Sequence, residues 1–349
     1  MLKSIEWNKG KPKILDQLVL PHKTAYVLSA TYKVTAEAIR SMKIRGAPAI
    51  GVAAAFGMAQ AAMASKAKDV EGLKKDLEKA GDFLKATRPT AVNLAWGVER
   101  MLHALHKNRS AKIKALKDNL VAEALEIARE DAALCDAMAQ NGAELIRDGD
   151  RILTHCNTGA LATAGIGTAL GVIKKAWLDG KKISVWVDET RPYLQGARLT
   201  AFELAEAGIP HTLVTDSTAA LLMSKKLVDL VIVGADRITA QGDVANKIGT
   251  YGLSIIAKAH QVPFYVAAPL NTVDLRLQKG EDIPIEERSA DEVLMVNGKP
   301  IAPKGTKAAH YGFDVTPNGN ISAIITEAGL HRAPYRQSLE KAVKEFGYK

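Results

Sequence analysis

The chain has 349 residues, a net charge of +9 at pH 7 and 47% hydrophobic residues. This length exceeds one ordinary hydrophobic core and predicts two domains, and the composition is typical of a globular protein. Two cysteines cannot form a disulfide framework, and the N-terminus has no signal-peptide pattern. No uninterrupted apolar stretch approaches a membrane span. We therefore expect a cytoplasmic protein that binds no membrane.

The excess of basic residues raises the question of nucleic-acid binding. The basic residues are scattered, however, and aromatic residues make up only 5% of the chain. Short lysine pairs occur at positions 74–75, 174–175, 181–182 and 225–226. Because they form no basic stripe interleaved with aromatics, we expect a solvated basic surface and no nucleic-acid partner. A positive field would also favour a phosphorylated substrate.

The first part of the chain predicts a small antiparallel β-meander, over residues 5–33, followed by a helical region. Ala- and Leu-rich segments with helical spacing follow the meander. The last of them is long and is expected to join two domains. The predicted helices are 36–42, 48–64, 70–86, 91–105 and 113–146.

From residue 151 onward, short apolar runs alternate with helical patterns, which indicates βαβ units and a parallel sheet. Residues 274–306 are rich in charge and proline and predict a loop excursion. We expect an α/β protein: residues 131–349 form a Rossmann-like catalytic domain with helices on both faces of its sheet, and residues 1–130 form the β-meander and helical domain. The predicted strands are 151–155, 183–187, 211–214, 230–234, 263–267 and 321–326.

A cysteine follows the first of these strands. The segment His155-Cys156-Asn157-Thr158-Gly159 comes at the strand's carboxyl end, and a helix is predicted over residues 161–170. A thiol at a helix N-terminus has its thiolate favoured by the helix dipole. The alternative is an ordinary buried cysteine, because free cysteine is among the most buried residue types. Cys135, inside a helical pattern, is interpreted as structural.

A second strand ends in Gly234-Ala235-Asp236, and ligands of open α/β sheets bind outside the carboxyl ends of the strands. Asp236 is therefore a candidate acid or base. A glycine-marked loop follows and leads to Asn246-Lys247, where a helix is predicted to begin. A helix N-terminus offers unpaired N–H groups to an anion, so this segment is a candidate phosphate site.

A third strand runs into a polar segment, residues 188–196, that contains Gln195 before a glycine. An amide side chain at this position can bind sugar hydroxyls. The alternative is a helix start at which Asp188 or Thr190 is the N-cap.

Two arginines of the helical region are candidate phosphate ligands. In Arg45-Gly46-Ala47-Pro48 the proline is placed at the first position of a helix, so that Arg45 and the N–H groups of Gly46 and Ala47 would face an anion. Arg88 also lies between two predicted helices. The alternative is a pair of loops with solvated arginines, and the residues alone do not decide.

No cofactor is expected. The histidines are dispersed without metal-binding spacing, and no Walker A loop is present. The glycines at 165 and 167 imitate a dinucleotide fingerprint, but they lie about ten residues beyond the strand end rather than in the tight turn. We interpret them as glycines that let a helix pack closely on the sheet.

Taken together, these motifs resemble the methylthioribose-1-phosphate isomerases of methionine salvage, over nearly the whole chain. One departure is His310-Tyr311-Gly312, where the family usually has Asn-Pro-Ala. The same fold is shared by ribose-1,5-bisphosphate isomerases and by regulatory subunits of the eukaryotic initiation-factor exchanger, which lack the catalytic pair. The matching stretches are 44–51 (IRGAPAIG), 87–96 (TRPTAVNLAW), 155–163 (HCNTGALAT), 188–196 (DETRPYLQG), 234–238 (GADRI), 242–251 (GDVANKIGTY), 283–288 (IPIEER) and 313–317 (FDVTP).

The resemblance implies an aldose–ketose isomerase that converts 5-methylthio-α-D-ribose 1-phosphate to 5-methylthio-D-ribulose 1-phosphate as a homodimer. It implies Asp236 as the proton donor and Cys156 as its partner. The implied substrate contacts are Arg45, Gly46, Ala47, Arg88, Gln195, Asn246 and Lys247.

The chemistry requires an acid to open the ring, because phosphate blocks the anomeric oxygen. Burial can prepare a carboxyl such as Asp236 for this role by raising its pKa. A Cys156 thiolate could then take the C2 proton, or a direct hydride shift could occur, and the sequence leaves both routes open. Since the implied contacts come from both domains, we expect ligand to close them onto each other. Sister sugar-phosphate isomerases and a non-catalytic subunit remain alternatives.

Overall fold

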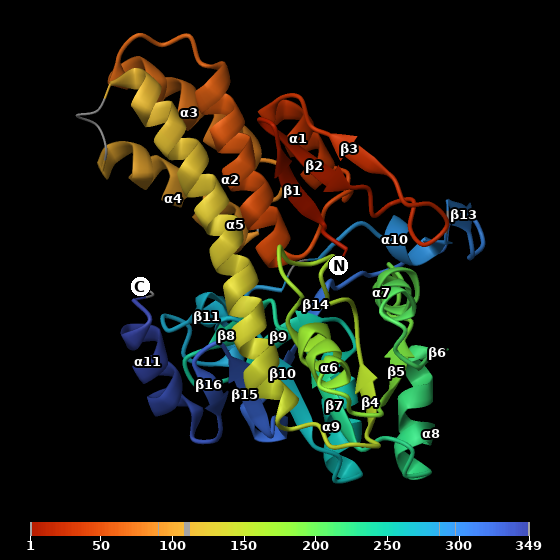
Figure 1. Cartoon of the computed structure of the whole chain (residues 1–349). Coiled ribbons are helices and arrows are strands. Elements are labelled where there is room, and N and C mark those ends of the chain that lie inside the picture. The colour runs from red at the N-terminus through yellow and green to blue at the C-terminus, as the bar shows by residue number, and fades with distance from the viewer. Residues whose placement is uncertain (1, 90, 108–111, 286, 297, 348–349) are drawn as a thin grey trace. The chain divides into compact units, whose positions relative to one another are not determined.

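The computed structural model describes residues 2–89, 91–107, 112–285, 287–296 and 298–347. Thr90 and Glu286, which belong to two of the matching stretches, lie outside these residues. The chain divides into two compact units. Unit 1 comprises Met1–Ala133 and Ala160–Gly167, and unit 2 comprises Leu134–Gly159 and Thr168–Lys349. Figure 1 shows the elements of each unit.

Unit 1 contains the predicted antiparallel meander and the predicted helices. Strand β2 pairs with β1 on one side and with β3 on the other. The helix bounds agree with the sequence prediction to within a few residues, and the largest differences are the start of α1 and the end of α5. The elements are β1 Ile5–Asn8, β2 Lys11–Leu15, β3 Tyr26–Leu28, α1 Tyr32–Arg40, α2 Ala47–Ala64, α3 Val70–Lys85, α4 Val92–Lys107 and α5 Ile113–Ala143, whose last part lies in unit 2.

Helix α2 forms the centre of unit 1 because small residues let its neighbours approach closely. A Cβ on Gly97 of α4 would lie 2.5 Å from the carbonyl oxygen of Gly51 in α2, so only glycine fits there. By length and composition α2 could cross a membrane, which corrects the sequence-based statement that no stretch approaches a span. Since 78% of this helix is buried inside the protein, we interpret it as a core helix.

Unit 2 contains a seven-stranded sheet in the order β16-β15-β10-β7-β4-β5-β6. All neighbouring strands are parallel except β15 and β16, so the predicted parallel sheet is confirmed. Its strands are β4 Arg151–Thr154, β5 Ser184–Asp188, β6 His211–Val214, β7 Leu230–Val233, β10 Phe264–Ala267, β15 Ala323–Thr326 and β16 Gly329–His331.

Alternate residues of the central strands pack against opposite faces of this sheet. In β7, Ile232 belongs to the core cluster that contains residues of α6 (Ala169–Leu178). Its neighbours Val231 and Val233 belong to the cluster that contains residues of α8 (Ala219–Ser224) and α9 (Thr250–Ala259). Helices therefore cover both faces, as the sequence predicts. Two further helices are α7 Ala201–Glu206 and α11 Tyr335–Glu345.

A smaller four-stranded sheet, in the order β11-β8-β9-β14, was not predicted. Its strands contain polar residues and so lack the apolar runs that identified the strands of the larger sheet. Residues 274–306 form an excursion of short elements, as expected. These strands are β11 Val273–Asp274, β8 Arg237–Thr239, β9 Val244–Lys247 and β14 Phe313–Thr316, and the excursion contains α10 Asp291–Leu294, β12 Met295–Val296 and β13 Lys299–Pro300.

The helix predicted over residues 161–170 is wrong, because α6 begins only at Ala169. The loop before α6 uses two of its backbone carbonyls in hydrogen bonds with other segments of unit 1. The Leu161 carbonyl accepts from the Gln17 side chain at 2.8 Å, and the Ala162 carbonyl accepts from the Ala49 N–H at 3.1 Å. A helix would need these carbonyls for its own hydrogen bonds. Glycines 165 and 167 lie in this loop, so their proposed role in helix packing is wrong as well.

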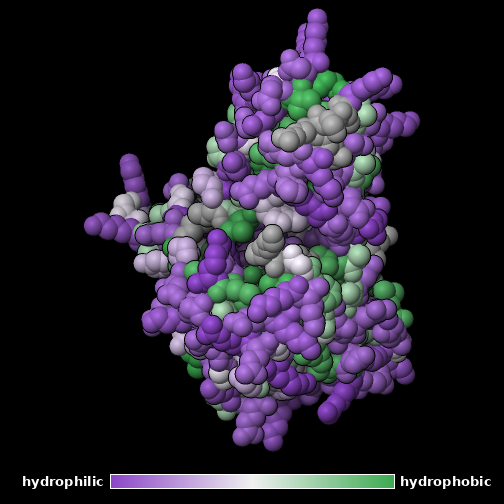
Figure 2. Space-filling model, turned by 90° about the vertical axis from the view of Figure 1, so that its left-hand side faces the viewer, coloured by the Kyte–Doolittle hydropathy of each residue, from purple (hydrophilic) through white to green (hydrophobic). Residues whose placement is uncertain are grey.

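Several large hydrophobic residues of the described chain are exposed, among them Leu28, Leu178 and Ile301. Figure 2 shows a mostly hydrophilic face with small hydrophobic areas between polar side chains. Single exposed hydrophobic residues are normal in globular proteins.

Candidate active site

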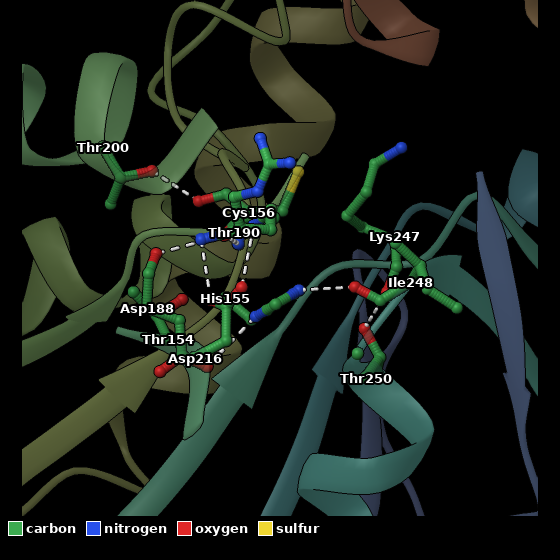
Figure 3. Close-up of polar contacts among 12 residues, drawn as sticks. Thr154, His155, Cys156, Asp188, Thr190, Thr200, Asp216, Lys247, Ile248 and Thr250 are labelled. Atoms are coloured by element: carbon green, nitrogen blue, oxygen red, sulfur yellow. Dashed lines mark hydrogen bonds and ion pairs between the residues drawn. The ribbon is translucent and has the colours of Figure 1, made fainter. Parts of the chain in front are cut away.

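Cys156 lies directly after β4 in a strained backbone conformation. Its φ of +63° falls in the left-handed region that residues other than glycine seldom adopt, and its side chain is buried. Two threonine hydroxyls hold this conformation. Thr190 Oγ1 accepts from the Cys156 N–H at 2.8 Å, and Thr200 Oγ1 donates to the Cys156 carbonyl at 2.6 Å (Figure 3). Strain of this kind persists where neighbours enforce it, often at functional sites.

The electrostatic setting of Cys156 differs from the sequence prediction. No helix starts at residue 161, so the dipole that the sequence analysis invoked is not there. The polar neighbours that surround the Cys156 backbone come instead from the segments after β5 and before α7.

His155, the residue before Cys156, makes two hydrogen bonds inside unit 2. Its Nδ1 lies 3.0 Å from Oδ2 of Asp188, and its Nε2 lies 2.9 Å from the carbonyl oxygen of Ile248 (Figure 3). A carbonyl oxygen only accepts, so Nε2 carries a proton. Burial by itself lowers the pKa of His155, but the hydrogen bond and the charge of Asp188 outweigh burial and leave it raised. Burial raises the pKa of the Asp188 carboxyl as well, so His155 Nδ1 and Asp188 Oδ2 hold one proton between them.

His155, Asp188 and Asp216 together resemble a metal-ligand set, because their ligand atoms lie within 4.8 Å of one another. Their hydrogen bonds argue for a different interpretation. Both ring nitrogens of His155 have partners, and the two carboxylate oxygens of Asp216 accept from the N–H groups of Thr190 and Arg191, each at 2.7 Å. We interpret the three side chains as a hydrogen-bonded network that shapes the turns around Cys156. The sequence-based alternative, with Asp188 or Thr190 as a helix N-cap, is wrong.

Lys247 and Asn246 lie at the end of β9, and α9 begins three residues after Lys247, not at it as the sequence predicted. Lys247 is buried; its Nζ donates to the Gly312 carbonyl at 2.9 Å and lies 4.5 Å from the centroid of the Phe313 ring. Asn246 donates to Thr250 Oγ1 at 3.0 Å. In Figure 3 the Lys247 ammonium and the Cys156 sulfur both project above His155.

The N-terminus of α9 is already occupied. The Asp314 carboxylate accepts from the Gly249 N–H at 2.7 Å and from the Tyr251 N–H at 3.0 Å. An acidic side chain here satisfies the N–H groups that the sequence analysis assigned to a phosphate. A phosphate cradle on this helix terminus is therefore wrong, and the basic group that remains on this segment is Lys247.

Asp236 follows β7, and its backbone N–H donates to the Ala245 carbonyl at 2.9 Å. Its side chain is exposed, whereas the sequence analysis expected a buried carboxyl.

Gln195, the candidate ligand of a sugar hydroxyl, is buried, with only 4% of its surface exposed. Among the described residues, Oε1 of Gln195 is buried without a hydrogen-bond partner. A ligand hydroxyl would satisfy this oxygen.

In unit 1, α2 begins at Ala47, so Pro48 is the second helical residue rather than the first. Gly46 before it has a φ of +89°, and a Cβ at this position would lie 2.5 Å from Cα of Ala162. Only glycine can therefore bring the start of α2 against this loop. Arg45 is buried.

Arg88 lies beside the segment that leads to Arg45. Its Nη1 is 3.7 Å from the sulfur of Met42, three residues before Arg45 in the chain. A cavity of about 270 Å³ is lined in part by Arg88 and Leu94. Unit 1 thus places its two candidate phosphate ligands on neighbouring segments.

Sequence reasoning missed several residues that shape the site. Nothing in the sequence identifies Thr200 or Gly312, since their contacts span 44 and 65 residues. His155 could have been suspected, because it adjoins the candidate cysteine. Thr190 lay in a polar segment that the sequence analysis did single out.

The chain is similar to known proteins over most of its length. The family model "Initiation factor 2 subunit family" matches residues 43–333. A methylthioribose-1-phosphate isomerase of Chloroflexus aurantiacus is 52% identical over 340 residues, which cover 97% of this chain and 98% of the relative.

Two solved structures match nearly the whole chain. The 5-methylthioribose 1-phosphate isomerase of Pyrococcus horikoshii OT3 is 43% identical with a TM-score of 0.93, over 99% of this chain and 96% of that one. A chain from A. fulgidus described as translation initiation factor eIF-2B subunit delta is 46% identical with a TM-score of 0.90, over 99% of this chain and all of that one. The chain therefore belongs to the initiation factor 2 subunit family and groups within it with the methylthioribose-1-phosphate isomerases.

Proposed function

We propose that this protein is an aldose–ketose isomerase that converts 5-methylthio-α-D-ribose 1-phosphate to 5-methylthio-D-ribulose 1-phosphate. The observation that carries the proposal is the strained Cys156 turn. Cys156 is buried in a left-handed conformation, and threonine hydroxyls hold both of its backbone polar groups. Such a conformation costs free energy that simple packing of a cysteine does not require, and it is common at functional sites. The similarity to isomerases over nearly the full length supports the same conclusion.

In this proposal Asp236 donates a proton to the ring oxygen while the ring opens. Cys156 then either takes the C2 proton as a thiolate and returns it to C1, or assists a hydride shift from C2 to C1. In both routes the Asp236 carboxylate takes the proton of the C2 hydroxyl as the ketone forms. The Asp236 side chain is exposed. The bound sugar would have to exclude water from it and so prepare it as an acid.

The family resemblance assigns the phosphate to basic and backbone groups. We keep Lys247 and the Asn246 amide as candidate ligands. We also keep Arg45, Arg88 and the N–H groups of Gly46 and Ala47. Gln195 is assigned to a sugar hydroxyl, which would pair its buried Oε1.

The test is a substrate panel with the purified protein. Formation of the ketose is followed by NMR for the 1-phosphates of 5-methylthioribose and 5-deoxyribose and for ribose 1,5-bisphosphate. We expect the highest kcat/KM for the methylthio sugar, in the presence of a chelator as well as without it. A higher value for the bisphosphate would replace the proposed substrate by its sister compound.

A second candidate is a non-catalytic subunit of a larger assembly, which the name of the A. fulgidus relative favours. Absence of turnover on all three sugars would support it. We further propose a homodimer, which light scattering coupled to gel filtration would test. A mass near 75 kDa is expected, twice the 37.4 kDa of the chain, and a mass near that of one chain would reject the dimer.

A further inference from the structure

We propose that His155 is a positioning residue that ties the Cys156 turn to the Lys247 segment through one hydrogen bond at each ring nitrogen. The inference rests on the proposed function, because it assigns His155 a part in the geometry of that site. His155 reaches two segments that are far apart in the chain: Asp188 is 33 residues away and Ile248 is 93 residues away.

The first contact acts on the Cys156 turn. Asp188 holds Nδ1 of His155 through Oδ2, while its backbone carbonyl accepts from Thr190 Oγ1 at 3.0 Å. The same Thr190 oxygen accepts from the Cys156 N–H. Asp188 therefore supports the turn twice, through the ring of the preceding residue and through the hydroxyl that holds the Cys156 backbone.

The second contact acts on the Lys247 segment. His155 Nε2 donates to the carbonyl of Ile248, the residue after Lys247, and the ring packs on Gly249. A Cβ on Gly249 would lie 3.0 Å from Cε1 of His155, and Gly249 has a φ of +104°. The ring thus fills the space that a side chain at this position would take, and it fixes the end of β9.

Three carboxyl side chains lie around His155. Asp188 and Asp216 lie on the β5–β6 side of His155, and Asp314 lies on β14, beside Gly249. Against the effect of burial, Asp188 raises the pKa of His155, and burial raises the pKa of both Asp188 and Asp314. The positioning by His155 therefore rests on the two hydrogen bonds of the ring and not on its charge.

Two substitutions separate the contacts. The amide of His155→Asn overlays Nδ1 and keeps the bond to Asp188, but it cannot reach Ile248. The amide of His155→Gln overlays Nε2 and keeps the bond to Ile248, but it leaves Asp188 without its partner. We expect His155→Asn to raise KM about tenfold with a smaller change in kcat, and His155→Gln to lower kcat about tenfold with a smaller change in KM, since tenfold corresponds to the loss of one hydrogen bond of about 1.4 kcal/mol.

A readout independent of turnover is alkylation of Cys156, followed by mass spectrometry with buried Cys135 as the internal reference. His155→Gln should alter the alkylation rate of Cys156, whereas His155→Asn should mainly abolish protection by inorganic phosphate. If each variant shows its own effect and not that of the other, the result supports positioning by two separate contacts. Equal proportional losses in both variants, or wild-type kinetics and alkylation in both, would overturn it.

A milder substitution, Asp188→Asn, keeps the inference testable if the His155 variants fail to fold. A neutral His155 can then donate from Nε2 to Ile248 and accept from the new amide at Nδ1. We expect at least a third of wild-type activity at neutral pH, and loss of activity in this folded variant would contradict positioning by the two contacts. If the wild-type protein turns over no sugar phosphate, the proposed function fails, and the alkylation experiment still decides the role of His155.

Discussion

The two proposed catalytic groups lie at the ends of neighbouring parallel strands, yet their settings are opposite. Cys156 after β4 is buried, and side chains from two other segments hold its backbone. Asp236 after β7 is exposed, and its backbone N–H pairs with Ala245 on the adjacent β9. The backbone of the thiol residue is thus held by side chains of unit 2, whereas the carboxyl is exposed. Substitutions that act on one group and spare the other test this difference.

The largest effect is expected from Cys156→Ser. The variant keeps the size of the side chain and the backbone contacts to Thr190 and Thr200, so it should fold normally. Turnover should fall by about 10²–10⁴-fold, the usual contribution of a group that moves a proton. Steady-state kinetics and a thermal melt measure both quantities, and full activity would remove Cys156 from the mechanism.

Asp236→Asn should also lower kcat by at least about 10²-fold, because an amide cannot donate the proton that opens the ring. Since this side chain is exposed, the free energy of unfolding should change by no more than about 0.5 kcal/mol, as is typical of surface sites. The melting temperature should therefore change little. KM should change much less than kcat. A variant with weak binding but normal kcat would make Asp236 a binding residue instead.

Lys247→Ala should chiefly weaken binding of the phosphate. We expect KM to rise about 10–100-fold, as for the loss of a charge-assisted hydrogen bond worth about 1.5–3 kcal/mol. The matched control is Lys258→Ala on the exposed side of α9, where the ammonium contacts Gly319 and Asn320. Inorganic phosphate should inhibit the wild type and the control alike. An unchanged KM in Lys247→Ala would show that the phosphate binds elsewhere.

Thr190→Val tests whether the fold positions Cys156. The substitution keeps the shape of the side chain but leaves the buried Cys156 N–H without its acceptor, at a cost of about 1–3 kcal/mol. We expect a lower melting temperature, a slower kcat and altered alkylation of Cys156. Unchanged alkylation and turnover would show that the left-handed turn does not depend on this hydroxyl.

The smallest effect concerns Asp131, a carboxyl with a setting unlike that of Asp236. Burial raises the pKa of Asp131 to about 6, although its hydrogen bond from the Ala164 N–H at 2.6 Å opposes this shift. A raised carboxyl pKa favours the protonated folded state, so its contribution to stability is complete below pH 4 and is lost as the pH rises towards 6.

Asp131→Asn should remove this loss. We compare the free energy of unfolding of the variant with that of the wild type at each pH. The difference should grow in favour of the variant by about 1–2 kcal/mol between pH 4 and pH 7. One pKa unit is worth about 1.4 kcal/mol, and the value is reduced because solvent reaches part of the side chain. Denaturant titrations at the two pH values measure it. A difference that does not depend on pH would place the ionisation of Asp131 in its ordinary range.

The sequence predicted the larger elements because they have clear periods. The strands before Cys156 and Asp236 and the helices from Val70 to Lys85 and from Val92 to Lys107 were found within a few residues. Strands β8 and β9 were missed because polar residues interrupt them, so that neither forms an apolar run such as the one in β7. The helix expected after Cys156 was wrong because tertiary hydrogen bonds to Gln17 and Ala49 outweigh local propensity.

For the site, the sequence placed the candidate residues Cys156 and Asp236 after two strands but did not predict how each group is surrounded. The exposure of Asp236 and the occupation of the α9 N-terminus by Asp314 depend on contacts between distant segments. Thr200 and Ile248 reach the Cys156 turn in the same way. Such contacts leave no local pattern, so the structure was needed to find them.

The most direct test of the central claim is conversion of 5-methylthioribose 1-phosphate by the wild type, Cys156→Ser and Asp236→Asn side by side, followed by NMR. The account predicts rapid formation of the ketose phosphate by the wild type and at least a hundredfold slower formation by both folded variants. An unreacted substrate with the wild type, or wild-type rates in both variants, would contradict it.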